Sequence, residues 1–301
     1  MTIAVTIRTG IAAVFAADSK LTTRGLIGFD EGGEPQFVNQ TYDNATKIVA
    51  DTSGFAMALV AGSASLGRIS VMDYIASSAV PEAPDDATQE AAVRDFAAGM
   101  AKLRTAYWQE AKVSPDKWPI TSVMLAIAPS YANEPLTWHL LFGGDEPDVT
   151  LIQTRVFLDG SYDGAFSLLY GHRSDVIDDL AKALRIGDQP VGQEAIYQAL
   201  QSTKVIRPID KLALRAMPIQ DAIDLAVFLA TTQVQIERFL PGEPYCGGPI
   251  DVMVLKGKSS RFPTATGGRG TGGGERQFVR SAWGSVTVPG LARAARPAWS
   301  R

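Results

Sequence analysis

Short apolar runs, separated by glycine and polar residues, make up much of the first 61 positions of the chain. Runs of about four to eight apolar residues between turn signals are typical of strands that are buried on both faces. The runs predict two hairpins, formed by residues 3–8 with 11–17 and by residues 47–51 with 55–61. Between the hairpins, residues 22–44 are polar and rich in glycine, which predicts a long loop or an exposed hairpin.

Beyond residue 62, apolar positions recur at a spacing of three or four, the period of an amphipathic helix. This pattern predicts helices over 66–79 and 88–112. Three strands follow at 121–128, 136–142 and 150–158, with 165–170 as a candidate fourth strand. The remaining predicted elements are helices at 174–184, 194–201 and 219–239, and a last strand at 250–255. Because strands and helices are grouped rather than alternating, we expect an α+β fold with sheets packed on each other and helices outside.

The composition is that of an ordinary folded protein and excludes several classes. The 301 residues are 46% hydrophobic and 20% charged, with one cysteine and two histidines. So few cysteines and histidines exclude a disulfide scaffold and a cysteine-rich zinc site, and we expect neither a metal nor a cofactor. No apolar run approaches the roughly 18–20 residues that span a bilayer, and no cationic segment precedes the first run. We therefore expect a cytoplasmic protein without a membrane segment or a signal peptide.

The charge is unevenly distributed. Residues 256–301 carry nine Lys or Arg and one Glu, whereas residues 1–255 carry a net charge of −12. The basic segment contains the run GGRGTGGG at 267–274, a composition that buries too little apolar surface to offset the entropy of ordering. We therefore expect one domain over 1–255 and a disordered basic tail over 256–301. An Arg/Gly tail permits nucleic-acid binding, but we interpret it as a solubilising or docking tail and expect no nucleic-acid partner.

The second residue is a candidate nucleophile. Thr2 follows Met1, and a small second residue normally permits removal of the initiator methionine. Removal would leave Thr2 with a free α-amine, whose pKa is about 7.7–8.0, beside its own hydroxyl. Such a threonine carries both a nucleophile and a base. Many chains begin in this way, so the signal depends on the motifs that follow.

Four motifs follow Thr2 in a regular order and spacing. They are FAADSK at 15–20, KIV at 47–49, AGSA at 61–64 and EPYCGGPID at 243–251. Asp18 stands sixteen residues after Thr2, and Lys47 begins a predicted strand. In this combination the chain resembles proteasome β-subunits, a family that includes the bacterial heat-shock-locus V peptidase and the bacterial ancestral β-subunit type, Anbu.

The resemblance implies an N-terminal nucleophile (Ntn) hydrolase with a four-layer αββα sandwich and threonine peptidase activity. Thr2 would attack the amide, and Lys47 would lower the pKa of the Thr2 hydroxyl. Asp18 would keep Lys47 charged and oriented, and the amide of Gly62 would stabilise the oxyanion. A peptide or protein substrate and a homo-oligomeric ring or stack are implied as partners, while any unfoldase partner is left unknown.

The chain departs from the family pattern in the residues that support the nucleophile. The family has D-x-x-S-G-G before its last strand, and here Glu243 replaces the Asp and Cys246 replaces the Ser. The family also places a Ser after a Gly where a strand meets the third helix. We expect that junction at Gly171, where His172 follows and the Ser is missing. These departures keep two alternatives open: a non-catalytic assembly subunit, and an amidase that acts on a non-peptide substrate.

Each candidate residue also has an ordinary structural interpretation. Asp18 would be a turn residue at a strand end, Lys47 an exposed strand lysine and Glu243 a solvated loop carboxylate. Cys246 has no His within its motif, so it is interpreted as a small buried residue rather than as a nucleophile. We favour structural roles for two further residues, His139 and His172. For His172 that role is a helix cap, and the alternative is a place at the mouth of the site.

Overall fold

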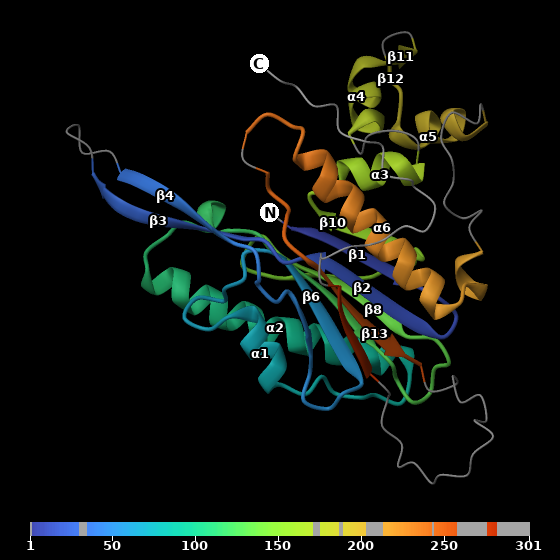
Figure 1. Ribbon diagram of the computed structural model, residues 1–301, viewed down its shortest axis with the longest axis horizontal. Coiled ribbons are helices and arrows are strands. Elements are labelled where there is room, and N and C mark those ends of the chain that lie inside the picture. The colour runs from blue at the N-terminus through green and yellow to red at the C-terminus, as the bar shows by residue number, and fades with distance from the viewer. Residues whose placement is uncertain are drawn as a thin grey trace, which may run out of the picture.

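The computed structural model describes residues 2–29, 35–170, 175–186, 189–202, 213–242, 244–257 and 276–281. Two antiparallel five-stranded sheets form its centre, and helices cover their outer faces (Figure 1). The predicted combination of packed sheets and outer helices is therefore confirmed. Among the helices of the described ranges, none is both long enough and apolar enough to cross a membrane.

The first sheet is built around the hairpin at the start of the chain. Its strands, in order across the sheet, are β10 (Val156–Gly160), β1 (Ile3–Arg8), β2 (Ala12–Asp18), β13 (Ile250–Lys256) and β14 (Arg276–Ser281). The Thr9 hydroxyl accepts the backbone N–H groups of Ile11 and Ala12 at 3.2 and 3.0 Å, which closes the turn between β1 and β2. Strand β14 lies within the segment 256–301 that is predicted as the tail. The residues on either side of β14, 258–275 and 282–301, lie outside the described ranges.

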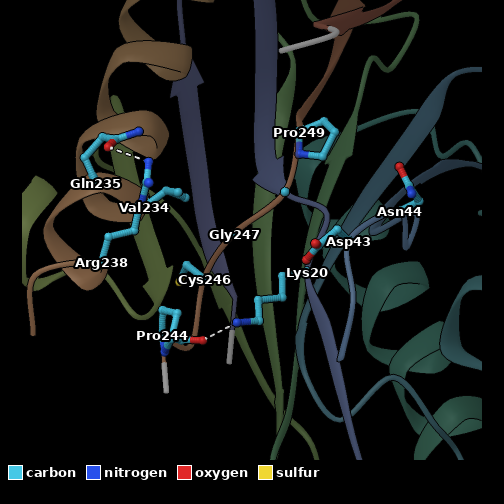
Figure 2. Close-up of a pocket in the computed structure, with 11 residues that line it drawn as sticks. Lys20, Asp43, Asn44, Val234, Gln235, Arg238, Pro244, Cys246, Gly247 and Pro249 are labelled. Carbon is cyan, nitrogen blue, oxygen red and sulfur yellow. Dashed lines mark hydrogen bonds between the residues drawn. The ribbon is translucent and has the colours of Figure 1, made fainter. Parts of the chain in front are cut away.

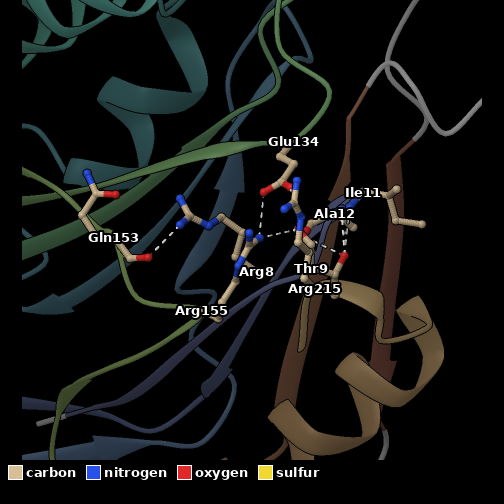
Figure 3. A network of polar contacts seen from close by, with 8 residues as sticks. All are labelled: Arg8, Thr9, Ile11, Ala12, Glu134, Gln153, Arg155 and Arg215. Atoms are coloured by element: carbon tan, nitrogen blue, oxygen red, sulfur yellow. Dashed lines mark hydrogen bonds and ion pairs between the residues drawn. The ribbon is translucent and has the colours of Figure 1, made fainter. Parts of the chain in front are cut away.

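Ion pairs fix the turn end of this sheet to neighbouring connections. Glu134 contacts Nη1 of Arg155 at 2.8 Å and Nε of Arg215 at 2.9 Å (Figure 3). Arg155 also donates to the carbonyl of Thr9 at 3.2 Å. The β1–β2 turn is thereby held to the segments around Glu134 and Arg155, which lie far from it in the sequence.

The second sheet contains the middle of the chain. Its strands, in order, are β5 (Ile48–Ala50), β6 (Ala56–Gly62), β7 (Thr121–Ile127), β8 (Leu136–Phe142) and β9 (Asp148–Leu151). The single strand predicted at 150–158 is wrong, because the chain forms β9 in this sheet and β10 in the first. The polar residues Gln153 and Thr154 are exposed between the two strands, and there the chain crosses from one sheet to the other.

Both faces of both sheets are covered, which explains the near-continuous apolar runs of the sequence. In β2, Phe15 and Ala17 point toward the second sheet, whereas Val14 and Ala16 pack beneath the helices of the first sheet. Many of the side chains between the sheets are alanines, and such small side chains let the two sheets approach closely.

Helices α1 (Val71–Ser77) and α2 (Asp86–Glu110) pack on the second sheet, and α3 (Asp163–Tyr170) and α6 (Ile219–Glu237) pack on the first. The remaining helical and hairpin elements are α4 (Val176–Ala183), α5 (Gln193–Ser202), η1 (Pro115–Lys117), η3 (Leu214–Ala216), β11 (Arg185–Ile186) with β12 (Gln189–Pro190), and β3 (Leu21–Phe29) with β4 (Pro35–Tyr42). The β3–β4 hairpin projects from the sheets, in agreement with the exposed hairpin predicted there (Figure 1).

The candidate strand at 165–170 is wrong, because these residues form most of α3. Ala165 and Leu169, four residues apart, both pack against the core of the first sheet, and Asp163 occupies the first turn. A spacing of four on one face is the helical period, and an acidic first turn suits the helix dipole. The helix therefore begins soon after β10 ends, and this brings the β10–α3 connection to the start of β1.

Candidate active site

Thr2 lies immediately before β1, where the β10–α3 connection holds its backbone. The carbonyl oxygen of Thr2 accepts the backbone N–H of Ser161 at 2.8 Å. Gly160 has a positive φ of 77°, and a Cβ built on it would lie 1.8 Å from that carbonyl oxygen. A side chain at residue 160 would therefore displace Thr2, so only glycine fits. Thr2 itself is buried, with 4% of its surface exposed.

A buried ion pair lies at the ends of two strands that belong to different sheets. Nζ of Lys47, just before β5, is 2.8 Å from Oδ1 of Asp18, the last residue of β2. Backbone N–H groups also donate to the carboxylate, from Ile3 to Oδ1 at 3.1 Å and from Gly247 to Oδ2 at 2.9 Å. Asp18 and Lys47 are both almost fully buried. This geometry does not match the structural interpretation, in which Lys47 is an exposed strand lysine and Asp18 is an ordinary turn residue.

Burial and the charge of the partner act against each other in this pair. Burial raises the pKa of Asp18 and lowers the pKa of Lys47, because each charged form loses solvation, while the attraction between the two charges reduces both shifts. The lowered pKa lets Lys47 release a proton more readily than a solvated lysine does. This property suits a group placed beside a hydroxyl nucleophile.

A small cavity brings Thr2, Lys47 and Gly62 together. Its volume is about 60 Å³, and its other lining residues are Leu21, Ala45, Thr46, Val60, Ala64 and Met72. Gly62 has a φ of 76°, and a Cβ built on it would lie 2.5 Å from the carbonyl oxygen of Ile120. Packing alone therefore requires glycine at residue 62. The mostly apolar lining and the small volume suit a small apolar group beside Thr2.

Cys246 lies beside the ion pair, in the segment that follows α6. Burial raises the pKa of its thiol to about 12, and the negative charges of Asp18 and Glu237 act in the same direction. The thiol therefore stays protonated near neutral pH, and this argues against Cys246 as a nucleophile. The same segment contributes Pro244, Cys246 and Gly247 to an open groove of about 630 Å³, where Nζ of Lys20 donates to the carbonyl of Pro244 at 2.6 Å (Figure 2).

Ser161 connects the backbone of Thr2 to a buried carboxylate on α6. The Ser161 hydroxyl donates to Oε1 of Glu237, which also accepts from Nε2 of Gln233 at 3.1 Å. The other carboxylate oxygen of Glu237 accepts the backbone N–H of Tyr245 at 2.8 Å. Glu237 is 4% exposed, so this network is shielded from solvent.

A second polar cluster lies between the sheets. The Ser122 hydroxyl donates to Asp159, and its oxygen lies 2.8 Å from Nε2 of His139. Burial alone raises the pKa of Asp159, but hydrogen bonds from His139 and Ser122 outweigh that effect and hold the pKa below its usual value. The same ring nitrogen of His139 faces both partners, with Asp159 at 3.7 Å, so the three residues do not form a Ser-His-Asp relay. The structural role predicted for His139 agrees with this geometry.

No family model matches the chain, and no curated protein matches it. Among solved structures, the chain is similar to one described as the helical assembly of the Anbu complex from Pseudomonas aeruginosa, at 12% identity and a TM-score of 0.45, over 94% of this chain and 88% of that chain. It is also similar to Anbu, the ancestral β-subunit, from Yersinia bercovieri, at 12% identity and a TM-score of 0.44, over 84% of this chain and 81% of that chain.

The chain is similar to Anbu. This is the type of protein that the sequence motifs indicate. At 12% identity the likeness assigns no residue of the site, so the roles of individual residues depend on the contacts of this chain. Within the described residues, no group of three or more His, Cys, Asp or Glu side chains is placed to hold a metal ion.

Most of the predicted site residues meet at one place. Thr2, Lys47 and Gly62 line one cavity, Asp18 pairs with Lys47, and Cys246 lies beside that pair. Their catalytic roles remain predictions. Two further residues named from the sequence, Glu243 and His172, lie outside the described residues.

The position predicted for the strand-to-helix junction is wrong. The strand that leads into the third helix is β10, which ends at Gly160, and Ser161 follows it. Residues 165–170 form most of α3 rather than a strand, so the junction lies at Gly160 and not at Gly171. The sequence does carry a signal for Ser161. It is a Gly-Ser pair directly after an apolar run, followed by Asp163 in a first-turn position.

Proposed function

We propose that this protein is an Ntn hydrolase of the threonine type that cleaves amide bonds in peptides. In this proposal its stacked sheets and outer helices are the αββα sandwich of that class. One observation carries the proposal: Thr2 and Gly62 line the same small cavity as Lys47, whose ammonium is held by Asp18. A hydroxyl, a cation and a backbone amide are the groups that acyl transfer on a terminal threonine requires.

The proposed reaction starts once Met1 has been removed. The free α-amine of Thr2 takes the hydroxyl proton as Oγ1 attacks the carbonyl carbon of the amide. The positive charge of Lys47 stabilises the developing alkoxide, and the N–H of Gly62 donates to the oxyanion, an interaction commonly worth roughly 3 kcal/mol. The C–N bond then breaks, the leaving nitrogen takes the proton from the ammonium, and an ester remains on Thr2.

Water completes the proposed cycle. The amine of Thr2, neutral again, takes a proton from a water molecule as that water attacks the ester carbonyl. The Thr2 oxygen leaves with a proton, and the acid product is released. Asp18 takes no direct part, because its carboxylate is occupied by Lys47 and by backbone N–H groups and so acts by holding Lys47 in place.

We further propose that the chain forms a homo-oligomer, as the sequence motifs imply. Large apolar side chains are exposed on and just after α6, including Phe228, Phe239 and Leu240, which is 55% exposed. Exposed large apolar side chains near the end of one helix favour a protein–protein contact surface there. Native mass spectrometry of the purified protein tests this proposal, and a strictly monomeric protein would contradict it.

Mass spectrometry of the intact protein, with and without a peptide epoxyketone, tests the hydrolase proposal. This electrophile needs both the amine and the hydroxyl of a terminal threonine. We expect a mass that lacks Met1 and an adduct that maps to Thr2, with no adduct in Thr2→Ala. Retention of Met1 would contradict the proposal. A processed protein that forms no adduct would favour a non-catalytic assembly subunit, and an adduct combined with turnover of only non-peptide amides would favour an amidase.

A further inference from the structure

Glu237 is a buried carboxylate on a helix face that is mostly apolar. The inward side of α6 is otherwise apolar up to its last turn, where Gln233 and Glu237 are both buried. Burying a carboxylate is unfavourable unless hydrogen bonds compensate, and an apolar residue would satisfy packing alone. Glu237 accepts three hydrogen bonds, from the Ser161 hydroxyl, the Gln233 amide and the Tyr245 backbone.

These bonds link Glu237 to both sides of the candidate site. On one side, the bond to Ser161 leads to Thr2, because the backbone N–H of Ser161 donates to the carbonyl oxygen of Thr2 at 2.8 Å. On the other side, Tyr245 belongs to the segment in which Gly247 donates its N–H to Asp18 at 2.9 Å. A single carboxylate therefore connects the residue proposed as nucleophile with the segment that supports the lysine–aspartate pair.

We infer that Glu237 is a positioning residue for Thr2, acting through Ser161. The inference rests on the proposed function, and it replaces the assignment that the sequence frame suggested, in which Glu243 would be the supporting carboxylate. Glu237 approaches no substrate and transfers no proton. It fixes the rotamer of Ser161 and the connection at 160–161, against which the backbone of Thr2 is packed.

The isosteric variant Glu237→Gln tests this inference sharply. A carboxamide has one acceptor oxygen, so it loses an acceptor either toward Ser161 and Gln233 or toward Tyr245. We expect kcat for a peptide amide to fall roughly ten- to a hundredfold, with KM nearly unchanged, because positioning acts on the reacting geometry rather than on binding. Glu146→Gln, at an exposed carboxylate between β8 and β9, is the matched control and should retain the parental kcat.

A double-variant cycle shows whether Glu237 acts through Ser161. If it does, Ser161→Ala combined with Glu237→Gln should lower kcat no further than the more damaging single variant. Glu237→Asp, which keeps both acceptor oxygens, should recover part of the lost rate. Multiplicative losses in the cycle, or equal losses in Glu237→Gln and Glu146→Gln, would overturn the inference. A Glu237→Gln protein that only melts at a lower temperature and keeps its kcat would overturn it too.

Backbone hydrogen exchange keeps the inference testable if the parent protein hydrolyses nothing. That result would contradict the proposed function, while the positioning of Thr2 would still be visible in the amide of Ser161. We expect this amide to exchange at least several-fold faster in Glu237→Gln than in the parent or in Glu146→Gln. Unchanged exchange at Ser161 would show that Glu237 does not hold the connection.

Discussion

Lys47 Nζ and Asp18 Oδ1 lie 2.8 Å apart and join the two central sheets beside Thr2. The two partners are held unequally. Asp18 also accepts backbone N–H groups from Ile3, Lys20 and Gly247, whereas the ammonium of Lys47 is held by the carboxylate. The carboxylate is therefore the centre of the arrangement, and loss of either partner should have different consequences.

We expect Asp18→Asn to destabilise the protein more than Lys47→Met does. The Asn variant leaves a buried ammonium without its counter-charge and points an amide N–H₂ toward backbone donors, a situation that costs about 3–5 kcal/mol in comparable pairs. The Met variant leaves a carboxylate that still accepts backbone N–H groups, so we expect a smaller loss of about 1–3 kcal/mol. Urea unfolding of both variants measures the difference. A larger loss in Lys47→Met would show that the backbone donors contribute little.

The stability of Lys47→Met should also depend on pH in a defined direction. Burial raises the pKa of Asp18, and the charge of Lys47 opposes that shift, so removing the charge raises the pKa further. A carboxyl whose folded pKa exceeds its unfolded value of about 3.9 binds more protons when folded, so its contribution to stability is lost as the pH rises. We expect the free energy of unfolding of Lys47→Met, relative to the parent, to fall as the pH rises above about 4, the unfolded pKa of an Asp side chain.

A double variant provides the control for this pH dependence. Asp18→Asn combined with Lys47→Met has no carboxyl at residue 18 and should show no such fall over the same range. Urea titrations at several pH values compare the three proteins. If Lys47→Met keeps a constant difference from the parent at every pH, the folded pKa of Asp18 does not depend on Lys47.

The sequence was sufficient for elements whose signal is local. The apolar runs of β1, β2 and β6 alternate between two buried faces, and the hydrophobic period of α2 and α6 is long enough to identify them. The spacing of the motifs was also informative, because Thr2, Asp18, Lys47 and Gly62 all belong to the ends of such strands.

The sequence failed where the outcome depends on long-range packing. Residues 150–158 have the length of a single strand, and only the pairing of β9 with β8 and of β10 with β1 divides them between two sheets. The contact between Ser161 and Glu237 joins residues that are 76 positions apart, and no local pattern in α6 marks its last buried position as a carboxylate with a partner. The motif therefore predicts a supporting carboxylate at Glu243, whereas the buried carboxylate next to Ser161 is Glu237 on the helix.

Gly160→Ala adds only one methyl group but should disable the site. A Cβ at residue 160 would lie 1.8 Å from the carbonyl oxygen of Thr2, and φ there is positive, so either the connection or Thr2 must move. We expect loss of the epoxyketone adduct at Thr2 and a destabilisation of more than about 1 kcal/mol. Gly143→Ala is the control, because a Cβ at residue 143 meets no atom within 4 Å. Adduct formation at the parental rate in Gly160→Ala would show that Thr2 is not held by this connection.

The single cysteine reports on the same site through its reactivity. Burial raises the pKa of the Cys246 thiol to about 12, so very little thiolate is present at neutral pH, and the side chain is 1% exposed. With a disulfide reagent near pH 8, we expect labelling at least about a thousandfold slower in the folded protein than in urea, since an ordinary thiol has a pKa of about 8.5. Because the chain has one cysteine, every label counts Cys246 alone.

Cys246→Ser should keep the adduct at Thr2, because a buried hydroxyl replaces a thiol that takes no part in the attack. Rapid labelling of the folded protein, or loss of the adduct in Cys246→Ser, would instead make the cysteine a reacting group and Thr2 a poor candidate for the nucleophile.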